Sequence, residues 1–233
     1  MTEDLVLTPS ASVSEAIETR RSIREFEERA VSEADVREIV DSARRSASGG
    51  NLQPWHLHVL TGDALKALLD RVAEKSKETP FGDGPEYSIY PADLSQPYRA
   101  RRGKVAEGMY ELLGIARDDV VGRGAAMAKN FRFFGAPVGM LLTIDRQMGP
   151  PQFCDLGIFL GNLMLLAREK GLHSCPQEAW SLWGGTIREV LGLPESELVF
   201  CGLALGYARG DSAINGLWTE RAALDEVARF SGF

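Results

Sequence analysis

The segment from Pro150 to Lys170 is the feature that most limits how this chain can fold. Two prolines begin it and Gly171 follows it, as expected at the two ends of a helix. A helix that is apolar nearly all round is covered on every side. We therefore predict that residues 150–170 form either the central helix of the fold or part of a subunit interface. The apolar residues that support this prediction are Phe153, Leu156, Ile158, Phe159, Leu160, Leu163, Met164, Leu165 and Leu166.

Shorter elements are predicted on both sides of this helix. Apolar runs of strand length occur at residues 55–60, 138–144 and 198–207. Helical spacing or capping residues predict helices at residues 15–20, 32–46, 63–77, 97–113, 118–134, 181–191 and 222–230. Residues 1–9 resemble a loose arm, and residues 172–180 a turn-rich link. Without repeats or a clear linker, we expect one α+β domain over residues 1–233.

The bulk properties exclude several classes of protein. A net charge of −7 and a pI of about 5.1 argue against a nucleic-acid partner. The first residues lack the basic start of a signal peptide, and the apolar stretch at residues 156–167 is too short for a bilayer, so no membrane partner is expected. Three widely spaced cysteines, Cys154, Cys175 and Cys201, favour a reducing cytoplasm.

Positive charge is concentrated near the N-terminus. Arg20, Arg21 and Arg24 surround Ser22 in this acidic chain. Guanidinium groups match phosphate oxygens, so the segment could hold a phosphate, although a solvated basic turn is the alternative. One predicted helix later, residues 46–55 read Ser-Ala-Ser-Gly-Gly-Asn-Leu-Gln-Pro-Trp, and their two glycines allow a backbone to approach a ligand closely.

Motifs of enzymes that carry their own catalytic groups are missing. The chain has no Gly-x-Gly-x-x-Gly after a strand, no phosphate loop and no Gly-x-Ser-x-Gly turn. His56 and His58 share one face of a predicted strand, but only His173 remains as a third histidine, so we expect no metal site. Phosphate-binding groups and aromatic residues without catalysts suit a bound redox cofactor, because the cofactor then supplies the chemistry.

The two N-terminal segments, at their observed spacing, resemble the signature of the FMN-dependent nitroreductase family. Residues 171–179, Gly-Leu-His-Ser-Cys-Pro-Gln-Glu-Ala, resemble the family's segment that lies over the flavin. Residues 203–207 and 215–221 resemble its C-terminal strand and phosphate-contacting tail. Residues 98–146 and the Pro-Gln-Glu-Ala-Trp sequence most resemble the branch that reduces nitroaromatics such as nitrobenzoates. The resemblance implies a nitroreductase-like fold: a central mixed, mostly antiparallel sheet flanked by helices, a long buried central helix and an intertwined homodimer.

The same resemblance implies which residues contact FMN. Arg20 and Arg24 would hold the phosphate, with a further contact from Arg221. Arg21 and Ser22 would contact the phosphate, the ribityl chain or the ring edge. Ser48, Gly49 and Asn51 would reach the site from the other subunit. Gln177, Glu178 and Ala179 would lie near flavin N5 and O4. Thr219 stands where members often have Lys, which implies one cation fewer at the phosphate. The full set of implied cofactor residues is Arg20, Arg21, Ser22, Arg24, Ser48, Gly49, Asn51, Gln53, Gln177, Glu178, Ala179 and Arg221.

The implied activity is reduction of nitroaromatic compounds with NAD(P)H by a ping-pong mechanism, with hydride transfer on flavin N5 and no catalytic residue from the protein. Other acceptors such as quinones or enones, or flavin binding without turnover, remain alternatives, as does the choice between NADH and NADPH. Residues 79–135 form an excursion whose irregular part, residues 79–97, could be a functional lid or a disordered loop. Candidate residues for stacking on a small aromatic acceptor are Tyr98, Phe131, Phe134 and Trp180.

Overall fold

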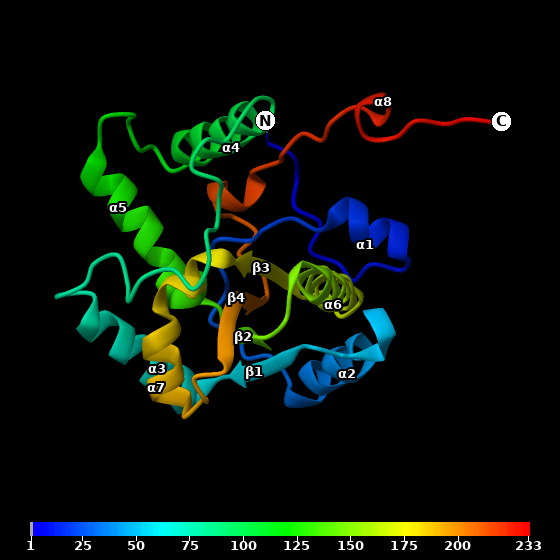
Figure 1. Cartoon of the computed structure of the whole chain (residues 1–233). Coiled ribbons are helices and arrows are strands. Elements are labelled where there is room, and N and C mark those ends of the chain that lie inside the picture. The colour runs from blue at the N-terminus through cyan, green and yellow to red at the C-terminus, as the bar shows by residue number, and fades with distance from the viewer. Residues whose placement is uncertain (1) are drawn as a thin grey trace.

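The computed structural model describes residues 2–233 and is built on one four-stranded sheet (Figure 1). The strands are β1 His56–Leu60, β2 Val138–Asp145, β3 His173–Gln177 and β4 Glu197–Gly206, in the order β1-β2-β4-β3. All three strand pairs are antiparallel. In the part of the chain that the structure describes, the only parallel pairing is an isolated bridge between Ser22 and Ser174. The predicted α+β fold is confirmed, and the mixed character of the sheet is limited to this bridge.

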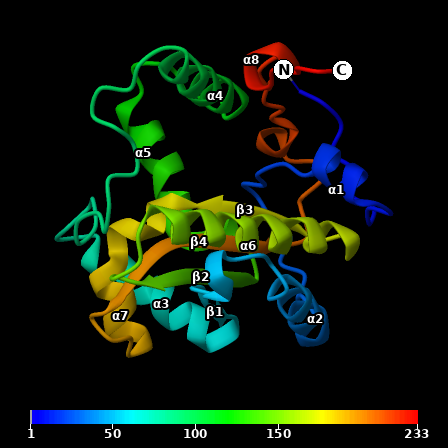
Figure 2. The ribbon, with the colours of Figure 1, turned by 45° about the vertical axis from the view of Figure 1, so that its right-hand side comes forward.

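Helices cover both faces of the sheet, as Figure 2 shows from a second side. On one face, α3 and α7 pack with two 3₁₀ segments, η2 and η3, around Leu68, Leu141 and Ile187. On the other face, α2 and α6 pack around Ile39, Met140 and Phe159. The bounds of these elements are α2 Glu33–Ala43, α3 Gly62–Lys75, α6 Pro150–Glu169, α7 Gly184–Leu191, η2 Lys129–Gly135 and η3 Glu178–Trp183.

The remaining helices lie at the margins of the fold. They are α1 Val13–Thr19, α4 Tyr98–Leu112, α5 Val120–Ala128 and α8 Leu224–Val227, with short 3₁₀ turns η1 Gly49–Asn51 and η4 Ala213–Gly216. The helix predicted at residues 118–134 ends early, because Phe133 and Phe134 adopt φ angles of 46° and 55°. No helix within residues 2–233 combines the length and the apolar character needed to cross a membrane.

Helix α6 is long and central, but the chain does not cover it on every side. Leu156, Phe159 and Leu163 are buried against the sheet. Ile158 is 39% exposed, and within the described residues nothing lies within 4 Å of a Cβ placed at Gly157 or Gly161. The uncovered side carries an exposed apolar side chain and two glycines, so the prediction that this helix is covered on every side does not hold within the single chain.

Two segments predicted to be irregular are held firmly in place. The N-terminal arm is not loose, because the buried guanidinium of Arg168 donates to the carbonyl oxygens of Val6 at 3.0 Å and Thr8 at 2.8 Å. The predicted link after α6 is the edge strand β3. A proline, Pro176, is tolerated there because an edge strand leaves one side of its backbone unpaired.

The loop at residues 79–97 has no helix or strand but is anchored on α7. The Asp83 carboxylate accepts hydrogen bonds from the backbone N and the hydroxyl of Thr186, at 2.6 and 2.8 Å. Glu86 pairs with Arg188 and, at 2.6 Å, with Arg146. A carboxylate at the first turn of α7 also complements the positive end of that helix. The loop is therefore attached to the end of the sheet where η3 begins.

The buried His173 makes stability depend on pH. Burial, and then the charge of Arg168 at 3.1 Å, lower the pKa of His173 to about 4. The pKa of an unfolded histidine is about 6.5. Between pH 6.5 and 4, therefore, His173 is protonated in the unfolded chain and neutral in the folded chain. We expect wild type to lose about 3 kcal/mol of unfolding free energy from this group between pH 6.5 and 4. Urea denaturation at several pH values in this range measures the unfolding free energy, which should fall less steeply with decreasing pH in His173→Gln than in wild type. The same pH dependence in both proteins would contradict the lowered pKa of His173.

Candidate functional site

The N-terminal arginines and the C-terminal segment meet around a small cavity. Arg20, Ser22 and Arg24 line it from one side, and Thr219 and Arg221 from the other, with Arg21, Leu217 and Trp218 completing the wall. Its volume is about 60 Å³, roughly twice the space a water molecule takes up in the liquid. We call Arg20, Ser22, Arg24 and Arg221 the clamp. Two parts of the sequence predicted to hold one phosphate are thus brought together.

The charges of the clamp are not neutralised within the chain. Across residues 2–233, Arg20, Arg24 and Arg221 take part in no ion pair, whereas several exposed arginines elsewhere do. Burial, and then the charge of Arg221, lower the pKa of Arg20 below its usual value. Arginine stays charged under such conditions, so the clamp holds like charges close together. An anion in the cavity would relieve this repulsion.

Arg21 is placed differently from its neighbours. It is 7% exposed, and its Nη1 and Nη2 donate to the carbonyl oxygens of Glu3 at 2.9 Å and Asp4 at 3.0 Å. Its guanidinium carbon lies 4.9 Å from the centroid of the Trp218 ring. Most of its donors are used to hold the N-terminal arm and the C-terminal segment together. Arg21 therefore shapes the wall of the cavity more than it supplies free donors.

Asn215 fastens the clamp and was absent from the predicted site. Its Oδ1 accepts from the backbone N of Arg24 at 2.9 Å and of Glu25 at 3.2 Å. Its Nδ2 donates to the carbonyl oxygens of Glu25 at 2.7 Å and Arg209 at 3.0 Å. The side chain is 1% exposed. Asn215 begins the segment that resembles the phosphate-contacting tail of the family, but it lies 191 positions from Arg24 and 190 from Glu25, so only the fold reveals that it holds their backbone.

Strand β3 leads from the clamp toward the residues predicted near the flavin ring. Ser22 bridges to Ser174, and the backbone N of Ile23 donates to the Ser174 carbonyl at 3.1 Å. Three residues later in the strand comes Gln177, about 10 Å away at the usual rise per residue. Gln177 is 3% exposed; its Nε2 donates to the Asn130 carbonyl at 2.7 Å, while its Oε1 has no partner. A buried acceptor without a partner is unusual and points to a missing donor.

Glu178 and Ala179 follow directly and begin η3, so they lie at the same end of the sheet. Burial raises the pKa of the Glu178 carboxyl above its usual value, and the hydroxyl of Tyr90 partly offsets this. Tyr90 belongs to the anchored loop at residues 79–97. The excursion and the predicted ring-edge residues are therefore in contact.

The second predicted group, residues 48–53, lies elsewhere on the chain. The backbone N of Gly49 donates to the buried Asp155 carboxylate of α6 at 3.2 Å, and the Ser48 hydroxyl accepts from the backbone N of Gln53 at 3.0 Å. Asn51 and Gln53 are exposed and have positive φ angles of 57° and 49°. No hydrogen bond or ion pair described for residues 2–233 joins this group to the clamp. It sits instead beside the uncovered side of α6.

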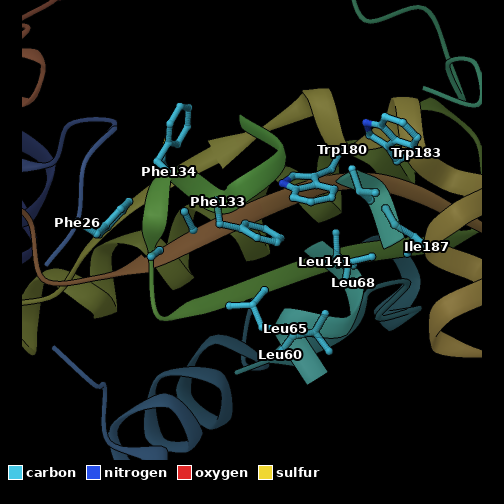
Figure 3. Close-up of a cluster of buried hydrophobic side chains, with 14 of the residues drawn as sticks. Phe26, Leu60, Leu65, Leu68, Phe133, Phe134, Leu141, Trp180, Trp183 and Ile187 are labelled. Carbon is cyan, nitrogen blue, oxygen red and sulfur yellow. The ribbon is translucent and has the colours of Figure 1, made fainter. Parts of the chain in front are cut away.

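The four aromatic candidates have different surroundings. Trp180 is fully buried, and its ring stacks on Phe133 with centroids 4.3 Å apart, as Figure 3 shows. Gly202 is required beneath it, because an added Cβ would lie 2.1 Å from the Trp180 ring. Phe134 is buried and points away from Phe133 in the same view. Phe131 packs edge-on against Trp180 and is half-buried, and Tyr98 is exposed.

These features fit the FMN implied by the sequence. The clamp supplies unpaired cations around a space suited to one phosphate group. The partnerless Gln177 Oε1 lies one ribityl length along β3, where a ring N–H could donate to it. The described residues contain no group of three histidine, cysteine or acidic side chains arranged to hold a metal ion.

Asn215 provides a test of how the clamp is held. Asn215→Ala leaves the backbone N–H groups of Arg24 and Glu25 without a partner. It also removes one of the two hydrogen bonds that the carbonyl oxygens of Glu25 and Arg209 each accept, so we expect a loss of about 3 kcal/mol of unfolding free energy. For a chain of this size that corresponds to a fall in Tm of about 6–12 °C. Asn162→Ala, which removes one side-chain hydrogen bond to Ser46, serves as the control and should cost about 1 kcal/mol. Equal losses would show that Asn215 has no special role.

Comparison with known proteins agrees with this geometry. The sequence pattern of the nitroreductase family matches residues 17–207. The chain is 36% identical to a chloronitrobenzene nitroreductase of Comamonas testosteroni over 95% of its own length and 97% of that protein. It is 37% identical to a 4-nitrobenzoate reductase of Pseudomonas putida, over 93% of this chain and 94% of that one.

Solved structures give the same result. The FMN- and NADPH-dependent nitroreductase NfnB of Sphigopyxis sp. strain HMH is 46% identical, covers 95% of this chain and all of its own, and superposes with a TM-score of 0.92. The FMN-dependent nitroreductase NfnB of Mycobacterium smegmatis, solved with NADPH, is 30% identical, covers 94% of this chain and 97% of its own, and gives a TM-score of 0.89. The chain therefore belongs to the nitroreductase family.

Proposed function

We propose that this protein is an FMN-dependent oxidoreductase that uses NAD(P)H to reduce nitroaromatic compounds. The observation that carries the proposal is the clamp: Arg20, Arg24 and Arg221 converge without a carboxylate partner at the start of the strand that leads to Gln177. Relatives named as nitrobenzoate and chloronitrobenzene reductases support the choice of acceptor. The absence of a nucleophile–base pair among the predicted site residues agrees with chemistry supplied by a cofactor.

The chain's residues would bind and orient the cofactor. Arg20, Arg24 and Arg221 would hold the phosphate, with the Ser22 hydroxyl as a further donor. Arg221 is itself oriented by Thr219, whose carbonyl and hydroxyl oxygens accept from its Nη1 at 2.9 and 2.8 Å. Thr219 therefore orients the Arg221 guanidinium, at a position where the family resemblance implies a lysine in many members. Gln177, Glu178 and Ala179 would contact the ring edge, where hydrogen bonds tune its reactivity.

FMN held by Arg20, Arg24 and Arg221 would supply the two-electron redox chemistry between NAD(P)H and the nitro group. The protein's part is to keep the ring accessible and to manage protons at its edge. A nitro group that is reduced to a nitroso group and water takes up two protons with the two electrons. Glu178, with its raised pKa, lies among the predicted ring-edge residues, where it could hold one of them.

We also propose that the active form is a homodimer with two sites at its interface, each chain acting as one domain. The uncovered apolar side of α6 supplies a surface for a second copy. The Ser48–Gln53 group sits beside that surface, held through Asp155, and is exposed in the single chain. Pairing through α6 would carry Ser48, Gly49, Asn51 and Gln53 toward the partner's clamp. Free cysteines support a cytoplasmic location.

The proposed acceptor side would be formed by the excursion. Tyr98 is exposed and Phe131 half-buried, so both could contact an aromatic ring directly. Phe134 and Trp180 are buried and would act mainly by supporting Phe131 from below. Because the loop at residues 79–97 is attached to α7, its position relative to Phe131 is fixed by the fold.

The clamp is tested by removing its cations one at a time. Arg20→Ala or Arg24→Ala should weaken FMN binding roughly 10- to 150-fold, the effect of losing a charge-assisted contact of about 1.5–3 kcal/mol. Arg71→Ala, on the exposed face of α3, is the control and should retain FMN like wild type. FMN absorbance after gel filtration and NADPH-dependent loss of 4-nitrobenzoate are the readouts. Equal flavin content in all three variants, or a wild type that takes up no FMN, would refute the function.

The dimer is tested at α6. Ile158→Glu places a charge on the uncovered apolar side and should convert the dimer into monomers with weakened FMN binding, because the partner's Ser48–Gln53 group is lost. Val121→Glu, at an 83% exposed residue of α5, is the matched control. Light scattering at fixed protein concentration measures the mass. A monomeric wild type that binds FMN fully would show that a second chain is unnecessary.

A further inference from the structure

Helix α4 carries positive charge that the proposed cofactor site does not use. Arg99, Arg101, Arg102 and Lys104 all lie in its first half, and its first turn has no acidic residue. Cations near the start of a helix are unfavourable, because that end already carries partial positive charge. The helix also has no buried residue to compensate. Arg99 lies in the first turn, whereas Lys104 lies beyond it, where this effect has faded, so the role of each cation depends on what its side chain faces.

The four cations divide between two sides of the helix. Arg99 donates to the Leu94 carbonyl at 2.8 Å, and Arg102 lies over the Tyr90 ring at 4.1 Å, so both hold the loop at residues 79–97. Arg101 and Lys104, also three positions apart, lie on another side. They face a cavity between α4 and the C-terminal segment. In Figures 1 and 2, α4 lies above the sheet, next to the segment that leads to α8.

This cavity, which we call the α4 groove, adjoins the clamp cavity and shares part of its wall. Its volume is about 520 Å³, within the range of small-molecule sites. Four residues that line it also line the clamp cavity: Leu217, Trp218, Thr219 and Arg221. Val105 and Pro97 add apolar surface. The groove thus offers an aromatic and apolar wall together with Arg101, Lys104 and Arg221.

The cations in the groove are available to an anionic ligand. Arg101 pairs with Glu226 at 3.0 Å and Lys104 pairs with Glu220, and all four side chains are about half exposed or more. Exposed ion pairs of this kind contribute little to stability and exchange readily with solvent. A phosphate dianion carries more charge and more acceptor oxygens than a carboxylate, so it can displace Glu226 and Glu220. Arg221 has no carboxylate partner among the described residues.

We propose that the α4 groove binds the adenosine 2′-phosphate of NADPH and makes the protein prefer NADPH over NADH. This inference rests on the proposed function, which requires a nicotinamide donor next to FMN. FMN carries one phosphate, which the clamp accommodates, so a second cationic site beside it suits the other polyanion of the reaction. Arg101 and Lys104 match a phosphate rather than a ribose hydroxyl. The indole of Trp218 provides a surface on which adenine could stack.

Steady-state kinetics of the FMN-saturated protein test the preference. With 4-nitrobenzoate as acceptor, Arg101→Ala and Lys104→Ala should each raise the KM for NADPH about tenfold, leave the KM for NADH within about twofold, and leave kcat unchanged. Glu226→Gln should lower the KM for NADPH, because it removes the competing carboxylate. Arg99→Ala, on the same helix but facing the loop, is the matched control. If these variants raise the KM for NADPH and for NADH by the same factor, or change neither KM, the proposal is overturned.

Direct binding separates this proposal from the proposed function. Calorimetry with 2′,5′-ADP and 5′-AMP compares two ligands that differ only in the 2′-phosphate and needs no turnover. Wild type should bind 2′,5′-ADP at least about tenfold more tightly, a difference of 1.4 kcal/mol, and the double variant Arg101→Ala/Lys104→Ala should lose this advantage. Equal affinities in wild type, or an advantage that survives in the double variant, would refute the groove. A protein without FMN or without nitrobenzoate reduction would instead refute the function.

Discussion

Electrostatic repulsion among Arg20, Arg24 and Arg221 is the constraint on which the rest of the structure depends. Three guanidinium groups converge on a small cavity, and within residues 2–233 none of them forms an ion pair with a carboxylate. Keeping them together requires rigid attachment on both sides. Asn215 supplies it on one side with four hydrogen bonds, and the bridge between Ser22 and Ser174 supplies it on the other. The proposed phosphate would offset the repulsion between these cations.

Strand β3 connects the two parts of the candidate site. The strand begins beside the clamp and ends at Gln177, so the sheet sets the distance between the clamp and Gln177. The buried Arg168 and the N-terminal arm brace the clamp end of the strand, and the aromatic cluster around Trp180 braces the other. The anchored loop at residues 79–97 then joins the ring edge to α4. One continuous surface therefore connects the phosphate site, the proposed acceptor side and the α4 groove.

Much of the fold could be predicted from the sequence, because its signals are local. The apolar periodicity of α6, the capping by Ser32 and the unbroken apolar run of β4 need no knowledge of neighbours. The edge strand β3 was missed because Pro176 and its polar residues resemble a turn, and pairing with β4 overrides that local preference. The early end of α5 was missed because it accompanies tertiary contacts: Phe133, which has a positive φ angle, packs on Gly139 and stacks on Trp180.

The same distinction applies to the site. Arg20, Arg24 and Arg221 were predicted as phosphate contacts from their charge and from the family pattern. Arg21 was predicted to contact the phosphate, the ribityl chain or the ring edge, but most of its donors are occupied with the backbone of Glu3 and Asp4. Asn215 and the α4 groove depend on segments far apart in the chain, and no spacing reveals them. The burial of Trp180 follows from the missing side chain at Gly202, a relation that exists only once β4 and η3 are packed together.

The central claim is that this clamp holds a flavin that passes electrons from a nicotinamide to a nitroaromatic compound. An anaerobic titration of the FMN-loaded protein with NADPH, followed at the flavin absorbance band, tests it most directly. The account predicts that about one equivalent of NADPH removes the absorbance and that 4-nitrobenzoate then restores it. A flavin that stays oxidised with both NADPH and NADH, or one that is reduced but not reoxidised by the nitro compound, would contradict it.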